Sequence, residues 1–149
     1  MHQLNFDVEA MIAFKKNLYL FTKNRTVPYS GYVKLYKLPA KPGHYTAELL
    51  DSLLLDNSNM LTDWITGADI SPDKKRIALL TSNKVWLFQD FEGANFFKGK
   101  ITPITLSHVS QKEGIVFINN SEVIICDEVF QHFLGGKLYH LDLSMFIQD

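Results

Sequence analysis

The sequence predicts an all-β fold, and three observations support this prediction. Short runs rich in β-branched and aromatic residues, such as residues 18–22 and 84–88, recur along the chain and are too short for typical helices. Turn-forming residues separate these runs. The pattern of runs and turns also repeats along the chain. Because tight turns join antiparallel strands, we expect several small antiparallel sheets.

The stretch 66–89 has the clearest pattern. It predicts strands at residues 67–70, 76–81 and 84–88. A tight turn is expected at residues 71–75, which contain Pro72 and Asp73, and a two-residue hairpin turn at residues 82–83, because Asn83 tolerates a positive φ. The run 77–80 (IALL) is apolar without alternation, so both faces of that strand should be buried. A small sheet buried on both faces is typical of a β-propeller blade stacked between two others.

The flanking regions predict two further units of the same kind. In the first, strands are expected at residues 8–14, 18–22 and 32–38, with a fourth at 45–55 that could instead be a helix. Residues 56–63 are expected to be a polar linker. A fourth strand of the middle unit follows a loop at 90–100 and covers 101–106, where Pro103 suggests an outer edge. The third unit predicts strands at 113–118, 122–126 and 137–143, and no clear fourth strand.

Sequence repeats support this division. Residues 34–38 (KLYKL) match residues 137–141 (KLYHL), and residues 9–11 match residues 113–115, with offsets of 103 and 104 residues. Two blades of about 50 residues explain both offsets. We therefore expect one partial β-propeller segment over residues 1–149, with about three four-stranded antiparallel blades at 7–55, 67–107 and 112–149, the last incomplete. A closed propeller needs at least about four blades, so a second copy of the chain or further blades of a longer chain would complete the ring.

Composition excludes several classes of protein. The apolar content of 46% in 149 residues indicates one globular domain and excludes disorder. The net charge of −1 argues against nucleic-acid binding. The apolar runs are far below the ~20 residues that a membrane helix needs. Cys126 is the one cysteine, so no internal disulfide is possible, and its apolar surroundings indicate a core residue.

Short motifs resemble those of known propellers. The run ISPD at residues 70–73, followed by KRIA at 75–78, resembles the SPDG blade motif of TolB-type propellers, with Lys74 in place of Gly. Residues 7–11 (DVEAM) and 112–115 (KEGI) resemble strands of the SdiA-regulated and phytase-like esterase propellers. The whole pattern, including residues 19–25, is similar to uncharacterised exported propeller proteins of Bacteroidetes-type bacteria.

This resemblance implies a periplasmic or secreted protein, and it implies calcium bound by acidic residues. The acidic pattern is incomplete here, because Ala10 and Ala68 stand where the family motif has Gly. The resemblance also suggests a function class, a calcium-dependent hydrolase of phosphate or carboxylate esters.

Charged residues should gather at one rim of the predicted sheets. The start of a first strand lies beside the end of its antiparallel second strand, which places the following residues together: Asp7, Glu9, Lys23, Arg25, Glu113, Asp127 and Glu128. Glu9 and Glu113 each open an apolar strand, where an unpaired carboxylate is costly. They are candidate calcium ligands, although pairing with Lys or Arg, or exposure to solvent, would also explain them.

No complete catalytic motif is present. The chain contains no H-E-x-x-H, no G-x-S-x-G and no phosphate loop. The main hypothesis is therefore a binding or scaffold module, the calcium-dependent ester hydrolase is the alternative, and whether the protein is an enzyme stays open. Trp86 is expected to be mostly buried between blades.

Overall fold

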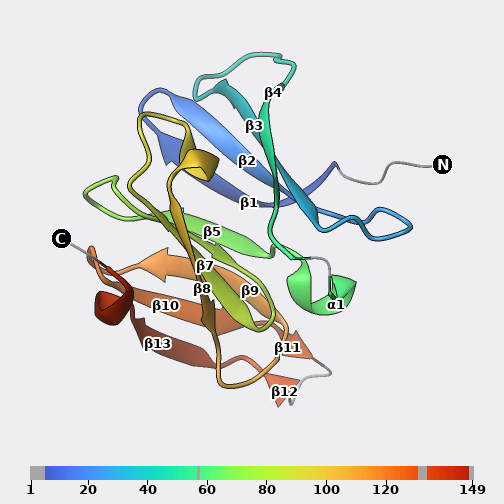
Figure 1. Cartoon of the computed structure of the whole chain (residues 1–149), viewed down its shortest axis with the longest axis vertical. Coiled ribbons are helices and arrows are strands. Elements are labelled where there is room, and N and C mark those ends of the chain that lie inside the picture. Colours follow the sequence, from blue (N-terminus) through green and yellow to red (C-terminus); the bar gives the residue numbers. More distant parts are fainter. Residues whose placement is uncertain (1–5, 57, 131–133, 148–149) are drawn as a thin grey trace.

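The protein is described by a computed structural model that covers residues 6–56, 58–130 and 134–147. Its strands form three main antiparallel sheets and one small hairpin, and the main sheets follow one another along the chain (Figure 1). The first sheet contains β1 (Asp7–Phe14), β2 (Asn17–Lys23), β3 (Tyr32–Pro39) and β4 (Glu48–Leu54). The second contains β5 (Gly67–Ile70), β6 (Ile77–Leu80), β7 (Lys84–Gln89) and β8 (Lys100–Thr105). The third contains β9 (Lys112–Phe117), β10 (Glu122–Asp127) and β13 (Leu138–Asp142).

The remaining elements are short. They are α1 (Met60–Asp63), the 3-10 helices η1 (Phe96–Lys98) and η2 (Ser144–Phe146), and a small hairpin of β11 (Val129–Phe130) and β12 (Leu134–Gly135). This hairpin lies in the predicted loop at 127–136, of which residues 131–133 are outside the described residues. No helix in the described ranges combines the length and the apolar character that a bilayer crossing requires.

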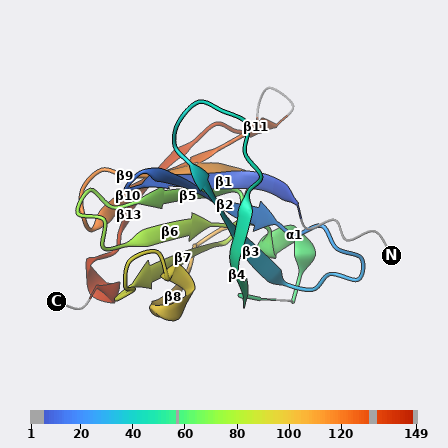
Figure 2. The ribbon, with the colours of Figure 1, turned by 90° about the horizontal axis from the view of Figure 1, so that it is seen from above.

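The three sheets are stacked so that their first strands are neighbours. Strand β5 contacts β1 of the first sheet on one side and β9 of the third sheet on the other. In Figure 1 the sheets follow one another from the blue strands through the green and yellow strands to the orange ones, and Figure 2 shows the same stack from above. The middle sheet is therefore covered on both faces.

Strand β6 connects two separate apolar cores. All four of its side chains, residues 77–80, are fully buried. Ile77 and Leu79 belong to the core between the first and second sheets, whereas Ala78 and Leu80 belong to the core between the second and third. This alternation confirms the prediction that both faces of the strand are buried.

An aromatic cluster from a loop fills the first core. The ring of Phe96, in η1, lies edge-on against Phe14, Tyr19 and Phe91, with centroids 5.6, 5.0 and 5.1 Å away. Phe96 is fully buried. The sequence predicted only a connecting loop here, because the aromatic pair at residues 96–97 has no periodic neighbours from which burial could be inferred.

The two turns of the middle sheet differ in geometry. Lys74 adopts a φ of 63°, so it keeps the left-handed conformation that the motif usually gives to Gly. Asp73 holds this turn, since its carboxylate accepts hydrogen bonds from the Ser71 hydroxyl (2.6 Å) and the Lys75 amide (3.1 Å). The expected positive φ at Asn83 is wrong: positive φ values of described non-glycine residues occur at Lys15, Lys74 and Asp90.

A side-chain hydrogen bond explains the second turn. The Thr81 hydroxyl accepts the Lys84 amide at 3.0 Å, and the Thr81 amide donates to the Lys84 carbonyl at 2.9 Å. These bonds close the two-residue loop, and the loop forms without a residue in the left-handed conformation.

Other differences from the sequence concern boundaries. The predicted linker at 56–63 contains α1, where the Asn59 side chain caps Leu61 and the Asp63 carboxylate accepts the Asn59 amide at 2.9 Å. The ambiguous stretch 45–55 forms strand β4, not a helix. Trp86 is partly buried and packs against the first core, which is compatible with the expectation that most of its side chain is covered.

A carboxylate joins the second and third sheets. Asp69 on β5 accepts a hydrogen bond from the backbone amide of Phe117 on β9, with 2.7 Å between Oδ2 and N. The two strands also approach closely at Gly67, where an added Cβ would lie 3.5 Å from the Glu113 carbonyl oxygen. These contacts set the distance between the two strands.

Candidate ligand-binding rim

The sequence-predicted rim forms where the first strands begin. Asp7 pairs with Lys23 across β1 and β2, and Lys112 pairs with Asp127 across β9 and β10. The first strands β1 and β9 both contact β5, which starts at the same edge. Charged residues from different sheets therefore meet at one end of the stack.

Two ion pairs hold the part of the rim that belongs to the first sheet. Lys23, which is almost buried, places its Nζ 2.5 Å from Glu9 Oε2, and Arg25 Nε lies 2.5 Å from Asp7 Oδ2. Arg25 also approaches Glu9 at 3.8 Å. Both cations lie over the ring of Trp64, at 5.1 and 4.9 Å from its centroid. Glu9 is thus neutralised by structural pairing, one of the explanations that the sequence left open.

A buried lysine organises the part that belongs to the third sheet. The Lys112 ammonium donates to the His108 carbonyl oxygen at 3.2 Å and makes a close contact with the Ser110 hydroxyl, and it lies 3.9 Å from Asp127 Oδ1. Burial lowers the pKa of Lys112, and the nearby Asp127 charge opposes this shift. Lys112 is not among the residues that the sequence predicts for the rim, because a lysine that opens a strand is usually exposed.

The Asp127 carboxylate is engaged by hydrogen bonds from neighbouring side chains. Its carboxylate accepts the Ser110 hydroxyl at 2.8 Å and the Tyr139 hydroxyl at 2.5 Å. The bond to Asp127 is the main reason that the pKa of Tyr139 is raised. Asp127 is therefore a rim residue, as predicted, but its contacts serve to hold Lys112, Ser110 and Tyr139 in place.

Glu113 differs from the other rim carboxylates. Among the described residues its side chain makes no hydrogen bond or ion pair, and it is exposed. Partial burial raises its pKa, the Glu9 charge raises it further, Lys23 lowers it and Glu128 raises it. Glu113, Glu9, Lys23 and Glu128 therefore lie close enough to interact, as the sequence predicted, while Lys23 and Glu9 satisfy each other.

A pocket of about 540 Å³ opens beside Glu113, between the end of β2 in the first sheet and the start of β9 in the third. Its wall combines apolar side chains from the connections with polar ones from strands and connections: Leu61, Trp64, Val109, Lys23, Thr66 and Lys112 are among them. The Thr66 hydroxyl is buried and finds no hydrogen-bond partner in the part of the chain that the structure describes. Two segments that line the pocket, α1 and residues 109–111, were predicted only as connections, so their contribution could not be seen in the sequence.

The rim does not fit the calcium site that the resemblance implies. Within the described ranges, no group of three or more His, Cys, Asp or Glu side chains is arranged to hold a metal ion. Of the two candidate ligands, Glu9 is engaged by Lys23, which leaves Glu113 alone. Calcium needs six to eight oxygen ligands.

The comparisons with known proteins assign no family. No family model matches the chain, and no curated protein is significantly similar to it.

Proposed function

We propose that this chain is a ligand-binding segment of a β-propeller and that the pocket beside Glu113 is its binding site. The observation that carries the proposal is that this one pocket is lined by the first sheet, by the third sheet and by the connections next to the second sheet. Propellers place their innermost strands around a common axis, and the neighbouring positions of β1, β5 and β9 support that architecture (Figure 1). Binding residues are often carried on the loops of such rigid scaffolds.

The charge balance of the rim favours a cationic ligand. Each of its three cations faces a carboxylate: Lys23 faces Glu9, Arg25 faces Asp7 and Lys112 faces Asp127. Glu113 and Glu128 are then in excess. A bound amine or guanidinium group would pair with Glu113 and relieve its repulsion from Glu9 and Glu128.

The apolar part of the pocket defines the rest of the ligand. Leu61 and Val109 are largely exposed at the pocket although both are apolar, and Trp64 adds a large surface between them and the charged rim. A ligand that joins a cationic group to a short apolar chain would cover these residues while it pairs with Glu113.

Calorimetric titration with n-butylguanidine and n-butylamine tests this proposal. n-Butanol supplies the same apolar part without the charge and should bind more weakly. Glu113→Gln should weaken binding of the cationic probes about five- to tenfold, the size of a partly exposed charge-assisted contact. Glu92→Gln, which removes an exposed carboxylate from the loop after β7, is the matched control and should have no effect. Equal affinities of both variants would refute the role of Glu113.

The uncovered faces of the outer sheets support association. Met11 on β1 and Val116 on β9 are apolar but half-exposed, as is Ile118 just after β9, and Leu138 on β13 is largely exposed. Because a closed propeller needs at least about four blades, further blades or a second copy of the chain would cover these faces. We expect the chain either to pair with itself or to continue such a ring.

The exported location and the hydrolase activity are supported only by the resemblance to known propellers. A periplasmic or secreted protein is the location that it implies. If the protein were such a hydrolase, it would turn over phosphate or carboxylate esters when calcium is present, and a chelator would abolish this turnover. No contact at the rim favours that activity over binding.

A further inference from the structure

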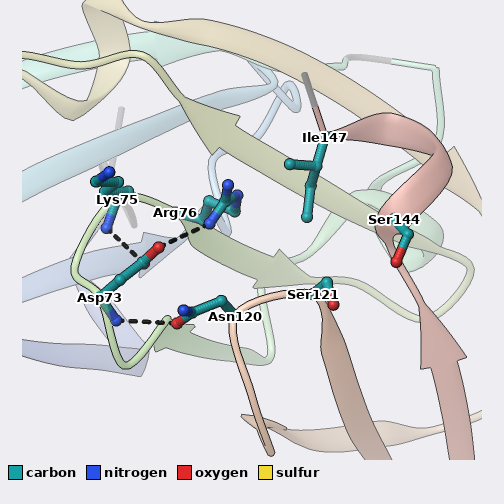
Figure 3. A pocket seen from close by; sticks show the side chains of 7 residues that line it. All are labelled: Asp73, Lys75, Arg76, Asn120, Ser121, Ser144 and Ile147. Atoms are coloured by element: carbon teal, nitrogen blue, oxygen red, sulfur yellow. Dashed lines mark hydrogen bonds and ion pairs between the residues drawn. The ribbon is translucent and has the colours of Figure 1, made fainter. Parts of the chain in front are cut away.

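A second pocket lies at the opposite end of the stack. The turn between β5 and β6, the turn between β9 and β10, and the segment of η2 surround a volume of about 500 Å³ (Figure 3). Asp73, Lys75 and Arg76 line it from the second sheet. Asn120 and Ser144 line it from the third sheet and η2. Any ligand here would contact two neighbouring sheets at once.

Several hydrogen-bond donors that line this pocket have no acceptor among the described residues. The Arg76 guanidinium bonds Asp73 through NH1 at 2.9 Å, but its Nε is buried and has no hydrogen-bond partner among the described residues. Lys75 is exposed, and its ammonium makes no hydrogen bond or ion pair with the described residues. The side-chain Oδ1 of Asn120 accepts a hydrogen bond from the Asp73 backbone amide at 3.0 Å, which leaves the side-chain NH₂ group of Asn120 for another acceptor.

The acceptors, in contrast, are occupied. Burial acts to raise the pKa of Asp73, but hydrogen bonds from Ser71 and Lys75 and the charge of Arg76 lower it overall, so the carboxylate is ionised and engaged. Asp73 balances one of the two cations. The lining therefore carries one positive charge in excess, with Lys75 unpaired.

Two further carboxylates lie next to this lining. Asp142 and Glu122 face each other across β13 and β10, next to the lining residues Ser144 and Ser121. Asp142 accepts the Ser144 hydroxyl at 2.6 Å, and Glu122 lies 3.2 Å from the His140 ring. Neither carboxylate lines the pocket, and both have other partners.

From this arrangement we propose that the pocket binds an oxyanion, a carboxylate or a phosphate group. An oxyanion offers only acceptors, which match the unused donors of Lys75, Arg76 and Asn120. Among the described residues, a cation would find the one lining carboxylate, Asp73, already bound to Arg76. Because the ion would bridge the second and third sheets, its binding should also stabilise their packing.

Titration of the full chain with inorganic phosphate, and separately with acetate, tests the proposal and distinguishes the two sources of the group. Heat of binding and the shift in melting temperature are measured together, since a ligand of the native state raises the melting temperature. We expect saturable binding with a dissociation constant of about 1 mM, because partly exposed ion pairs contribute little. Whichever anion binds more tightly identifies the group.

Three variants locate the binding. Lys75→Gln should weaken binding about fivefold, and because Lys75 is exposed this change should leave the fold intact. Arg76→Lys keeps the charge next to Asp73 but removes the guanidinium, and should weaken binding by a similar factor. Lys74→Gln removes the same charge from the same turn at a residue that does not line the pocket, and should leave binding unchanged.

The outcomes are decisive in each case. Loss of affinity in Lys75→Gln and Arg76→Lys, with Lys74→Gln unchanged, supports the site. Equal weakening in Lys75→Gln and Lys74→Gln would indicate only general attraction of anions to the turn and would overturn the proposal. Absence of saturable binding of both anions to the unmodified chain would overturn it as well.

Discussion

Leu79 and Leu80 on β6 provide a direct test of the stacked arrangement. They are adjacent in sequence and fully buried, but Leu79 packs between the first and second sheets and Leu80 between the second and third. If both interfaces are well packed, Leu79→Ala and Leu80→Ala should each destabilise the chain by a similar amount. If one interface is loose, the two substitutions should differ strongly.

The expected cost follows from the burial. Each substitution removes three carbon atoms, which costs about 2.4 kcal/mol at about 0.8 kcal/mol per buried carbon. The cavity that remains adds up to about 2 kcal/mol, depending on how far the neighbours collapse. We therefore expect a loss of about 2.5–4.5 kcal/mol from the free energy of unfolding for either variant.

Urea unfolding followed by tryptophan fluorescence measures this loss, with Trp64 and Trp86 as the probes. Leu49→Ala on β4 is the matched control, because its side chain is about half-exposed, and it should cost less than about 1 kcal/mol. A loss of less than about 1 kcal/mol for Leu80→Ala would refute the packing of the third sheet on the second. The same result for Leu79→Ala would refute the packing of the first.

Four further predictions concern single features of the structure. Because Trp86 is half-buried, Trp86→Ala should cost about 1–3 kcal/mol in urea melts, and a larger loss would mean that the first sheet encloses it. Lys74→Gly should stabilise by about 0.5 kcal/mol, since Gly relieves the left-handed strain, whereas a loss in thermal melts would exclude such strain. The pKa of Glu113 is raised above 4.5 in the folded state, so the folded chain holds the proton of this carboxyl to a higher pH than the unfolded chain does. The ionised form of Glu113 therefore destabilises the fold at neutral pH. Glu113→Gln should therefore stabilise at pH 7 by less than about 1 kcal/mol, and this gain should vanish below pH 4.5; a gain that is independent of pH would contradict the assignment. The isolated chain should be a homodimer or a poorly soluble fragment, and light scattering that finds a monodisperse 17.1 kDa monomer with a cooperative melt would refute both.

Much of the sheet arrangement could be predicted from the sequence, because strand and turn signals are local. The apolar run at 77–80 requires burial on both faces, and the repeated KLYKL pattern marks the third strands β3 and β13. Local signals also place the rim carboxylates near strand ends, with Asp7 and Glu113 close to the starts of β1 and β9 and Asp127 at the end of β10. Boundaries differ by a few residues, most at β4, which begins at Glu48 rather than at residue 45.

The pocket itself could not be predicted, because contacts between distant segments define it. Lys112 is buried only because Ser110, Asp127 and Tyr139 converge on it from three segments. Trp64 gains its role from Lys23 and Arg25, about forty residues earlier in the chain. Neither a charge nor an aromatic ring in a polar connection indicates by itself which partners it will meet.

The hydrogen bond between Asp69 and Phe117 has a consequence for aggregation. Strand β9 pairs with β10 on one side only, so its other edge carries backbone amides that could recruit a strand from another molecule. The Asp69 carboxylate occupies one of these amides and brings a negative charge to the edge. Asp69 thus acts as a gatekeeper: its replacement by an apolar residue would free the Phe117 amide and open the inner edge of the third sheet to intermolecular strand addition.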